Sequence, residues 1–162
     1  MTNARPDFVY TTYIKTTPEK LWGAITNPEF SRQYWGGHEN VSDWKKGSDW
    51  KHADSKKGGD VRIIGKVLES NPPKRLVLTW ADPSDTADES RVTFEIDNAG
   101  DMVRLNVIHG SFKPGSIMAD KVVLGWPLVL SSLKSFLETG KAIDVMGVKA
   151  ALNQSCDGEA AA

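Results

Sequence analysis

Apolar residues recur at helical spacing in one long segment, Val122 to Gly140, and this is the strongest structural signal in the chain. Steps of three and four residues place on one face Val122, Trp126, Val129, Leu130, Leu133, Phe136 and Leu137. The opposite face is expected to carry Ser131, Ser132, Lys134, Ser135 and Glu138. The pattern therefore predicts an amphipathic helix that buries one face against the rest of the fold.

Two residues define the expected limits of this helix. Gly140 favours a C-terminal cap, because glycine adopts the left-handed conformation without a Cβ clash. Pro127 has no amide hydrogen and is best tolerated in a first helical turn, so the main helix is expected to start near Gly125. A short helical piece over residues 116–124 and then a bend are expected before it.

The N-terminal part alternates β-branched and aromatic residues, which predicts a first strand over residues 8–16. One face of this strand is expected to hold Phe8, Tyr10, Thr12 and Ile14. Thr17 is a favourable N-cap and Pro18 suits the first helical position, so a short helix is predicted over residues 18–26. A second short helix, residues 29–34, is expected to follow.

The middle of the chain alternates strand patterns with turn residues at a spacing of about ten residues. Six consecutive strands are predicted, over residues 39–44, 48–53, 61–70, 75–81, 91–97 and 102–109. The acidic, polar stretch of residues 82–89 is expected to form a loop. A strand, two small helices, six strands and a long helix predict an α+β fold of the helix-grip type. In this fold a curved antiparallel sheet of about seven strands surrounds the C-terminal helix.

Composition narrows the class of protein. The chain has 162 residues and a formal charge of −1, which fits one domain and argues against nucleic acid as a partner. No apolar run approaches a membrane span of ~20 residues, and MTNARPDF does not resemble a signal peptide. The only cysteine is Cys156, so no internal disulfide is expected, and a soluble, cytoplasmic protein is predicted. The core is expected over residues 8–141, with a disordered tail over residues 150–162.

Four segments carry a resemblance to a known superfamily. They are YIKTTPEKLWGAITNPEF, GKVLESNPPKRLVLTW, ESRVTFEIDNAGDMVRLNVIHGSF and GWPLVLSSLKSFLETG. In this order they resemble the START-like, or SRPBCC-domain, proteins, and more narrowly the branch named after the activator of the heat-shock-protein-ninety ATPase. The resemblance implies a helix-grip fold with a cavity between the long helix and the concave sheet, which in related families holds lipids, sterols, polyketides or other apolar molecules.

Residues on the apolar faces that this fold brings together are the candidate ligand-binding residues. They are Tyr34, Trp35, Trp80, Phe94, His109, Phe112, Trp126, Leu130 and Leu133. Tryptophan combines a large apolar body with one N–H donor, which suits a ligand site. The same side chains are also expected if they simply fill a close-packed core, and the sequence leaves both interpretations open.

His109 is the one titratable residue that alternation places on an apolar face. It is interpreted either as a hydrogen-bonding or acid/base partner of a ligand, or as a core histidine whose nitrogens are satisfied internally. His38 and His52 show no spacing typical of metal ligands, so neither a metal nor another cofactor is predicted. Motifs for a nucleophilic serine or a phosphate-binding loop are also lacking.

Three classes of function remain. The first is a binding module that encloses a small apolar or aromatic molecule as a carrier, sensor or resistance protein. The second is a START-like cyclase, aromatase or hydrolase, for which only His109 with Tyr34 or Glu95 is a candidate set and no catalytic residue is assigned. The third is an interaction protein that stimulates a chaperone ATPase. No stimulation is expected, since the known activators carry a further chaperone-binding domain.

Overall fold

The structure is a computed structural model that describes residues 5–56 and 58–160, without the side chains of residues 156–160. The side chain of Cys156 and residues 161–162 of the expected tail therefore lie outside the described part of the chain. The elements are, in chain order, β1 (Phe8–Ile14), α1 (Pro18–Thr26), α2 (Pro28–Tyr34), β2 (His38–Val41), β3 (Asp49–Asp54), β4 (Val61–Asn71), β5 (Arg75–Asp82), β6 (Asp85–Ala99), β7 (Met102–Gly110), α3 (Ile117–Thr139) and α4 (Val145–Ala160).

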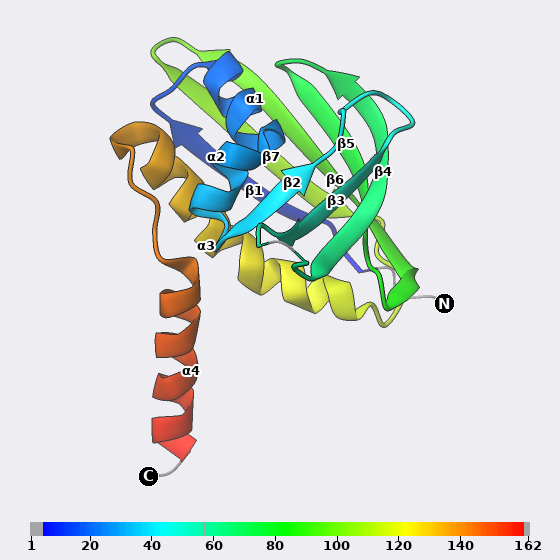
Figure 1. Ribbon diagram of the computed structural model, residues 1–162, viewed down its shortest axis with the longest axis vertical. Coiled ribbons are helices and arrows are strands. Elements are labelled where there is room, and N and C mark those ends of the chain that lie inside the picture. The colour runs from blue at the N-terminus through cyan, green and yellow to red at the C-terminus, as the bar shows by residue number, and fades with distance from the viewer. Residues whose placement is uncertain (1–4, 57, 161–162) are drawn as a thin grey trace.

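The seven strands form a single antiparallel sheet in the order β1-β7-β6-β5-β4-β3-β2. Every neighbouring pair except β1–β7 is consecutive in the chain, and β1 closes the far edge by pairing with β7. Figure 1 shows this sheet curving around α3, with α1 and α2 near β2 and with α4 projecting away from the body. The predicted α+β helix-grip fold is confirmed.

The start of the first helix follows the predicted capping chemistry. Thr17 accepts a hydrogen bond from the backbone N–H of Lys20 and so caps α1, and Pro18 occupies the first turn. Asn27 ends α1 and its side chain caps α2 by accepting from the N–H of Glu29. These two caps turn the chain from the edge strand β1 onto the inner side of the sheet, where Tyr34 is buried.

The strand β6 is longer than predicted. Residues 82–89 were expected to form a loop, but β6 begins at Asp85 after a tight turn at Pro83 and Ser84. The Asp82 carboxylate accepts hydrogen bonds from the backbone N–H and the hydroxyl of Ser84, which stabilises this turn. The polar composition misled the prediction, because this end of the strand has exposed residues around one buried carboxylate, Asp88.

The long helix α3 also departs from expectation. It runs unbroken from Ile117 to Thr139 with Pro127 inside it, so the predicted division into two pieces near Gly125 is wrong. Gly140 ends the helix in the left-handed conformation as predicted, with φ of 77°. The apolar stripe is buried or half-buried, but Ser132 is buried too, against the prediction that it faces solvent. Its hydroxyl is held by the backbone of Ile143, which follows α3.

The segment after α3 differs most. A disordered tail was expected from residue 150, whereas α4 continues to Ala160. Local propensity supports the helix at its centre, where residues 149–152 read KAAL, although the stretch also contains two glycines and its hydrophobic pattern is weak. Val145 is buried and anchors its start, while Met146 and Leu152 are exposed. Within the described part of the chain, the helices are all too short or too polar to cross a membrane.

Candidate functional site

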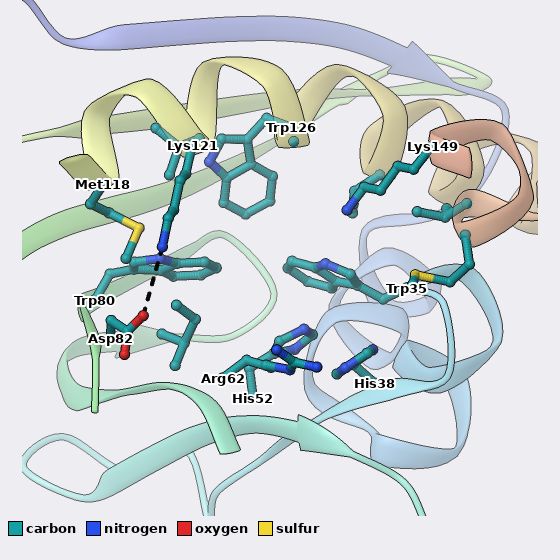
Figure 2. Close-up of a pocket in the computed structure, with 16 residues that line it drawn as sticks. Trp35, His38, His52, Arg62, Trp80, Asp82, Met118, Lys121, Trp126 and Lys149 are labelled. Carbon is teal, nitrogen blue, oxygen red and sulfur yellow. Dashed lines mark ion pairs between the residues drawn. The ribbon is translucent and has the colours of Figure 1, made fainter. Parts of the chain in front are cut away.

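A pocket of about 400 Å³ lies between α3 and the inner face of the sheet, and the start of α4 forms part of its rim. Its volume falls in the range of roughly 300 to 1,000 Å³ that is usual for small-molecule sites. It is lined by Trp35, His38, His52, Arg62, Ile63, Trp80, Asp82, Met118, Lys121, Val122, Gly125, Trp126, Val129, Val145, Met146 and Lys149. Figure 2 shows these side chains converging from the sheet, from α3 and from α4.

Three of the nine predicted candidate residues line this pocket, namely Trp35, Trp80 and Trp126. The other six, Tyr34, Phe94, His109, Phe112, Leu130 and Leu133, are buried in the core that supports it. The structure therefore brings the tryptophans of the prediction together at one cavity. It places the remaining candidates behind its wall.

The three pocket tryptophans form a compact triangle. The ring centroids of Trp35 and Trp126 lie 5.5 Å apart, those of Trp80 and Trp126 also 5.5 Å, and those of Trp35 and Trp80 6.4 Å. Each residue comes from a different element: Trp35 ends α2, Trp80 lies on β5, and Trp126 lies on α3. An aromatic site of this kind favours flat or apolar ligands, because large aromatic faces supply contact area with few rotatable bonds.

His109 is fully buried behind Trp126 in a complete hydrogen-bond chain. The indole N–H of Trp126 donates to Nδ1 of His109 at 3.0 Å, and Nε2 lies 2.8 Å from the hydroxyl oxygen of Ser90. Since an indole only donates, Nδ1 is the acceptor and the ring proton sits on Nε2. The Ser90 hydroxyl in turn donates to the Trp80 carbonyl oxygen at 3.2 Å. Burial lowers the pKa of His109 to about 3, so the ring is neutral and serves as a structural link.

Trp80 differs from Trp126 in one decisive respect. The residue is only 6% exposed, yet its indole N–H has no hydrogen-bond partner. Within the described residues, only Trp80 Nε1 and Thr16 Oγ1 are buried side-chain polar atoms without a partner. A buried unsatisfied donor is destabilising by about 1 to 3 kcal/mol. Trp80 lines the pocket, so this unsatisfied donor belongs to a residue of the pocket wall.

Two histidines form the floor of the pocket on β2 and β3. The rings of His38 and His52 stack with centroids 5.3 Å apart, and His52 lies 4.6 Å from the ring of Trp35. Nδ1 of His52 lies 2.8 Å from the side-chain oxygen of Asn40, whose amide nitrogen donates to the carbonyl of Ile25. Burial lowers the pKa of His52 to about 3, and the positive charges around the ring contribute to a smaller extent. His52 is therefore neutral and donates through Nδ1.

Neither a metal-binding cluster nor the catalytic set considered from sequence is assembled among the described residues. The described residues contain no cluster of three or more His, Cys, Asp or Glu side chains suited to a metal ion. The Tyr34 hydroxyl donates to the carbonyl of Ala24 at 2.9 Å, and Glu95 pairs with Arg75 at 2.7 Å on the outer side of the sheet. Neither side chain contacts His109 through a hydrogen bond, so the catalytic set considered from sequence is not assembled.

A second hollow, of about 760 Å³, lies over β3, β4 and β5, where Trp50 and Thr79 contribute to its wall. The indole N–H of Trp50 is already used there, since it donates to the carbonyl of Thr79 at 2.8 Å. This hollow thus offers no unsatisfied buried donor of the kind that Trp80 presents. The smaller, tryptophan-lined pocket is the better candidate for a binding site.

Sequence reasoning missed the polar wall of the pocket: His38, His52, Arg62, Asp82, Lys121 and Lys149. One signal was available for His52, because a hairpin joining the predicted strands 39–44 and 48–53 aligns Asn40 with His52, as observed. Lys149 lies on α4, for which no structure was expected. Arg62 and Lys121 are ordinary exposed cations in the sequence pattern, and only the folded arrangement places them at one pocket.

Comparison with known proteins gives one family match. Residues 15–138 match the model of the family described as Activator of Hsp90 ATPase homolog 1-like protein. No curated protein sequence matches the chain.

Solved structures with the same fold include three from different organisms. The chain is similar to protein MLL2253 from Mesorhizobium loti, with 26% identity and a TM-score of 0.68 over 82% of this chain and 96% of that one. It is also similar to the Aha1 dimer from Colwellia psychrerythraea (21% identity, TM-score 0.69, 85% and 100% covered). The third is PFC0360w, an HSP90 activator from Plasmodium falciparum (22%, 0.66, 81% and 95%). The resemblance found in the sequence is thereby confirmed.

Proposed function

The chain belongs to the family of Activator of Hsp90 ATPase homolog 1-like proteins, and we propose that it is a binding module that encloses a small apolar or aromatic molecule in the pocket lined by Trp35, Trp80 and Trp126. A fold of this kind hosts many activities, so the proposal rests on the site. The proposed binding function includes roles as a carrier, a sensor or a resistance protein. These roles share one requirement, reversible enclosure of a ligand.

One observation carries the proposal: the indole N–H of Trp80, which is deeply buried and lacks a partner at the wall of an aromatic pocket. Core tryptophans that only fill space normally have their N–H satisfied, as those of Trp126 and Trp50 are. A ligand acceptor atom would satisfy the Trp80 donor and remove the penalty of leaving it unpaired.

The proposal is tested with a panel of fatty acids, sterols, flavonoids and aromatic polyketides. Binding of each compound is monitored by the tryptophan emission and the thermal unfolding of the protein. A ligand present at 100 times its dissociation constant stabilises the native state by about 2.7 kcal/mol. For a domain of this size that corresponds to a rise in Tm of roughly 5 to 10 °C. Absence of any shift across the panel would contradict the proposal.

A pocket-filling variant sharpens the test. Gly125 lines the pocket, and a Cβ atom at this position would meet nothing within 4 Å. Gly125→Leu should therefore occupy the cavity and abolish binding, while better helix propensity keeps the ligand-free protein at least as stable. Gly23→Leu is the matched control, since Gly23 is also helical with open space around its Cβ position but lies outside the pocket.

A second candidate function, stimulation of an Hsp90-type ATPase, is favoured by the family description. It uses a protein surface, whereas ligand binding uses the pocket. An ATPase assay with micromolar protein separates the two, with Gly125→Leu included beside wild type. Saturable stimulation that survives Gly125→Leu would support the chaperone role, and no stimulation together with a ligand-induced Tm shift would support the binding module.

A further inference from the structure

Most of the charged side chains around the pocket are positive. Three cationic side chains line it, Arg62, Lys121 and Lys149, against a single carboxylate, Asp82. Asp82 is paired with Lys121 at 3.7 Å. Among the described side chains, Arg62 and Lys149 form no ion pair. Two positive charges at the pocket are therefore left without a neutralising carboxylate.

These two cations act at the same end of the pocket. Arg62 and Lys149 both lie close enough to His52 for their charges to contribute to its lowered pKa. His52 in turn packs against Trp35, with ring centroids 4.6 Å apart. In Figure 2, Lys149 and Arg62 lie on either side of the Trp35 ring, Arg62 beside His52, while Lys121 and Asp82 lie at the Trp80 end.

The opposite end of the pocket carries the neutral donor. The Trp80 N–H has no partner, and the neighbouring Lys121 is already engaged with Asp82. Between the two ends, the wall consists of the ring of Trp126 and of aliphatic side chains such as Val122 and Val129. The pocket thus combines a positive end, an apolar middle and, in its wall, one unsatisfied neutral donor.

We propose that the ligand is an amphipathic organic acid, whose ionised group pairs with Arg62 and Lys149 and whose apolar body packs in the pocket against Trp35 and Trp126. Where the body carries an acceptor oxygen, that atom accepts from the Trp80 N–H. This inference deepens the proposed binding function and rests on it. An anion is favoured over a neutral or cationic ligand because it neutralises two unpaired charges that flank a partly desolvated site.

The experiment compares acids with neutral analogues of the same shape. The probes are 2-naphthoic acid against 2-naphthamide, and dodecanoic acid against dodecanol, with binding measured by calorimetry and thermal shift at pH 8. Both acids are ionised there, so each pair differs in charge while the apolar body is unchanged. We expect each acid to bind more tightly than its neutral analogue.

Charge-removing variants assign this preference to the two cations. Arg62→Gln and Lys149→Gln should each weaken acid binding by about two- to fivefold and leave the neutral analogues unchanged. Both residues are exposed, so folding should be preserved. Lys20→Gln is the control, because Lys20 is an exposed lysine on α1 outside the pocket.

The outcomes distinguish this inference from the function on which it rests. If acids and neutral analogues bind equally, or if the preference survives in the double variant Arg62→Gln/Lys149→Gln, the anionic ligand is ruled out and the binding module stands. If no probe of either pair binds to wild type, the inference fails. If the panel of fatty acids, sterols, flavonoids and aromatic polyketides also shifts neither tryptophan emission nor Tm, the proposed binding function is contradicted as well.

Discussion

The indole N–H of Trp126 donates to Nδ1 of His109 at 3.0 Å, which fixes the histidine tautomer and joins α3 to β7 beneath the pocket. Trp80 lies beside this pair, with its ring centroid 5.5 Å from that of Trp126, but its own N–H has no partner. The two tryptophans are almost equally buried. They therefore offer a matched comparison between a satisfied and an unsatisfied buried donor.

We expect Trp126→Phe to lower the free energy of unfolding by about 1 to 3 kcal/mol more than Trp80→Phe does. Both changes remove similar volume, but only the first leaves a buried acceptor, Nδ1 of His109, without its donor. Trp80→Phe instead deletes a donor that was already unpaired. Denaturant unfolding of both variants measures the difference, and equal losses would show that the Trp126–His109 bond contributes nothing net.

Stability should fall as the pH drops below the ordinary histidine pKa. The pKa values of His52 and His109 are each lowered to about 3 in the folded protein, chiefly by burial, against 6.5 for a free side chain. The unfolded chain then binds protons that the folded state excludes. The contribution is complete above pH 6.5 and is lost progressively as the pH falls toward 3, by roughly 2 kcal/mol per histidine at pH 5.

Urea unfolding at pH 7.5, 6 and 5 checks this dependence. His52→Gln should halve the change in the free energy of unfolding between pH 7.5 and pH 5. Glutamine does not titrate, and its amide can still donate to Asn40. A free energy of unfolding that is the same at pH 7.5 and pH 5 would contradict the neutral, buried state of both rings.

Alternation predicted the inner wall of the site because it depends on regular local structure. On β7 the sequence assigns Val103, Leu105, Val107 and His109 to one face, and all four are fully buried. The same rule on β5 and the helical spacing on α3 placed Trp80 and Trp126 on faces that meet. Each of these assignments needs only the period of one strand or helix.

The polar wall could not be predicted in this way, because it is formed by tertiary closure. Arg62 lies on β4 in a run of exposed positions, Lys121 is exposed on α3, and Lys149 lies on a helix whose hydrophobic pattern is weak. In sequence each is indistinguishable from a solvated surface cation. Their shared role appears only when the folded chain brings the three elements to the rim of one cavity.

Asp88 should anchor the start of α3. Its carboxylate accepts from the Ser116 hydroxyl at 2.6 Å and from the Met118 backbone N–H at 3.0 Å, so it ties β6 to the first turn of the helix. Burial alone raises the pKa of Asp88, but these hydrogen bonds outweigh it and the pKa is lowered. Asp88 therefore contributes stability above the ordinary aspartate pKa near 3.8, and this is lost as the pH falls below it.

Asp88→Asn is expected to lower the free energy of unfolding at pH 7 by about 2 kcal/mol, because two charge-assisted hydrogen bonds to the carboxylate are weakened or lost. Asp85→Asn serves as the control, since Asp85 lies exposed at the start of the same strand. Thermal or urea unfolding of the two variants provides the comparison. A loss in Asp88→Asn no larger than that in Asp85→Asn would show that the anchor is dispensable.

The register of α3 is tested by placing one charge at neighbouring positions. Leu133 is 1% exposed in the core, whereas Ser131 is exposed and its hydroxyl donates only to the carbonyl of Pro127, one helical turn earlier. Leu133→Asp buries an unpaired carboxylate and creates a void, so we expect a loss above about 4 kcal/mol or failure to fold. Ser131→Asp should change stability by less than about 0.5 kcal/mol.

Ser132→Asp provides a third point on the same helix. Ser132 is fully buried, and its hydroxyl bonds with both the N–H and the carbonyl of Ile143, which fastens the segment between α3 and α4. A carboxylate there loses the bond to the carbonyl oxygen and places a negative charge beside it, so we expect a loss of about 1 to 3 kcal/mol, between the other two variants. The observed helix therefore predicts that the loss in the free energy of unfolding decreases in the order Leu133→Asp, Ser132→Asp, Ser131→Asp. A purely amphipathic register groups Ser132 with Ser131, and equal, negligible effects at these two positions would support that register instead.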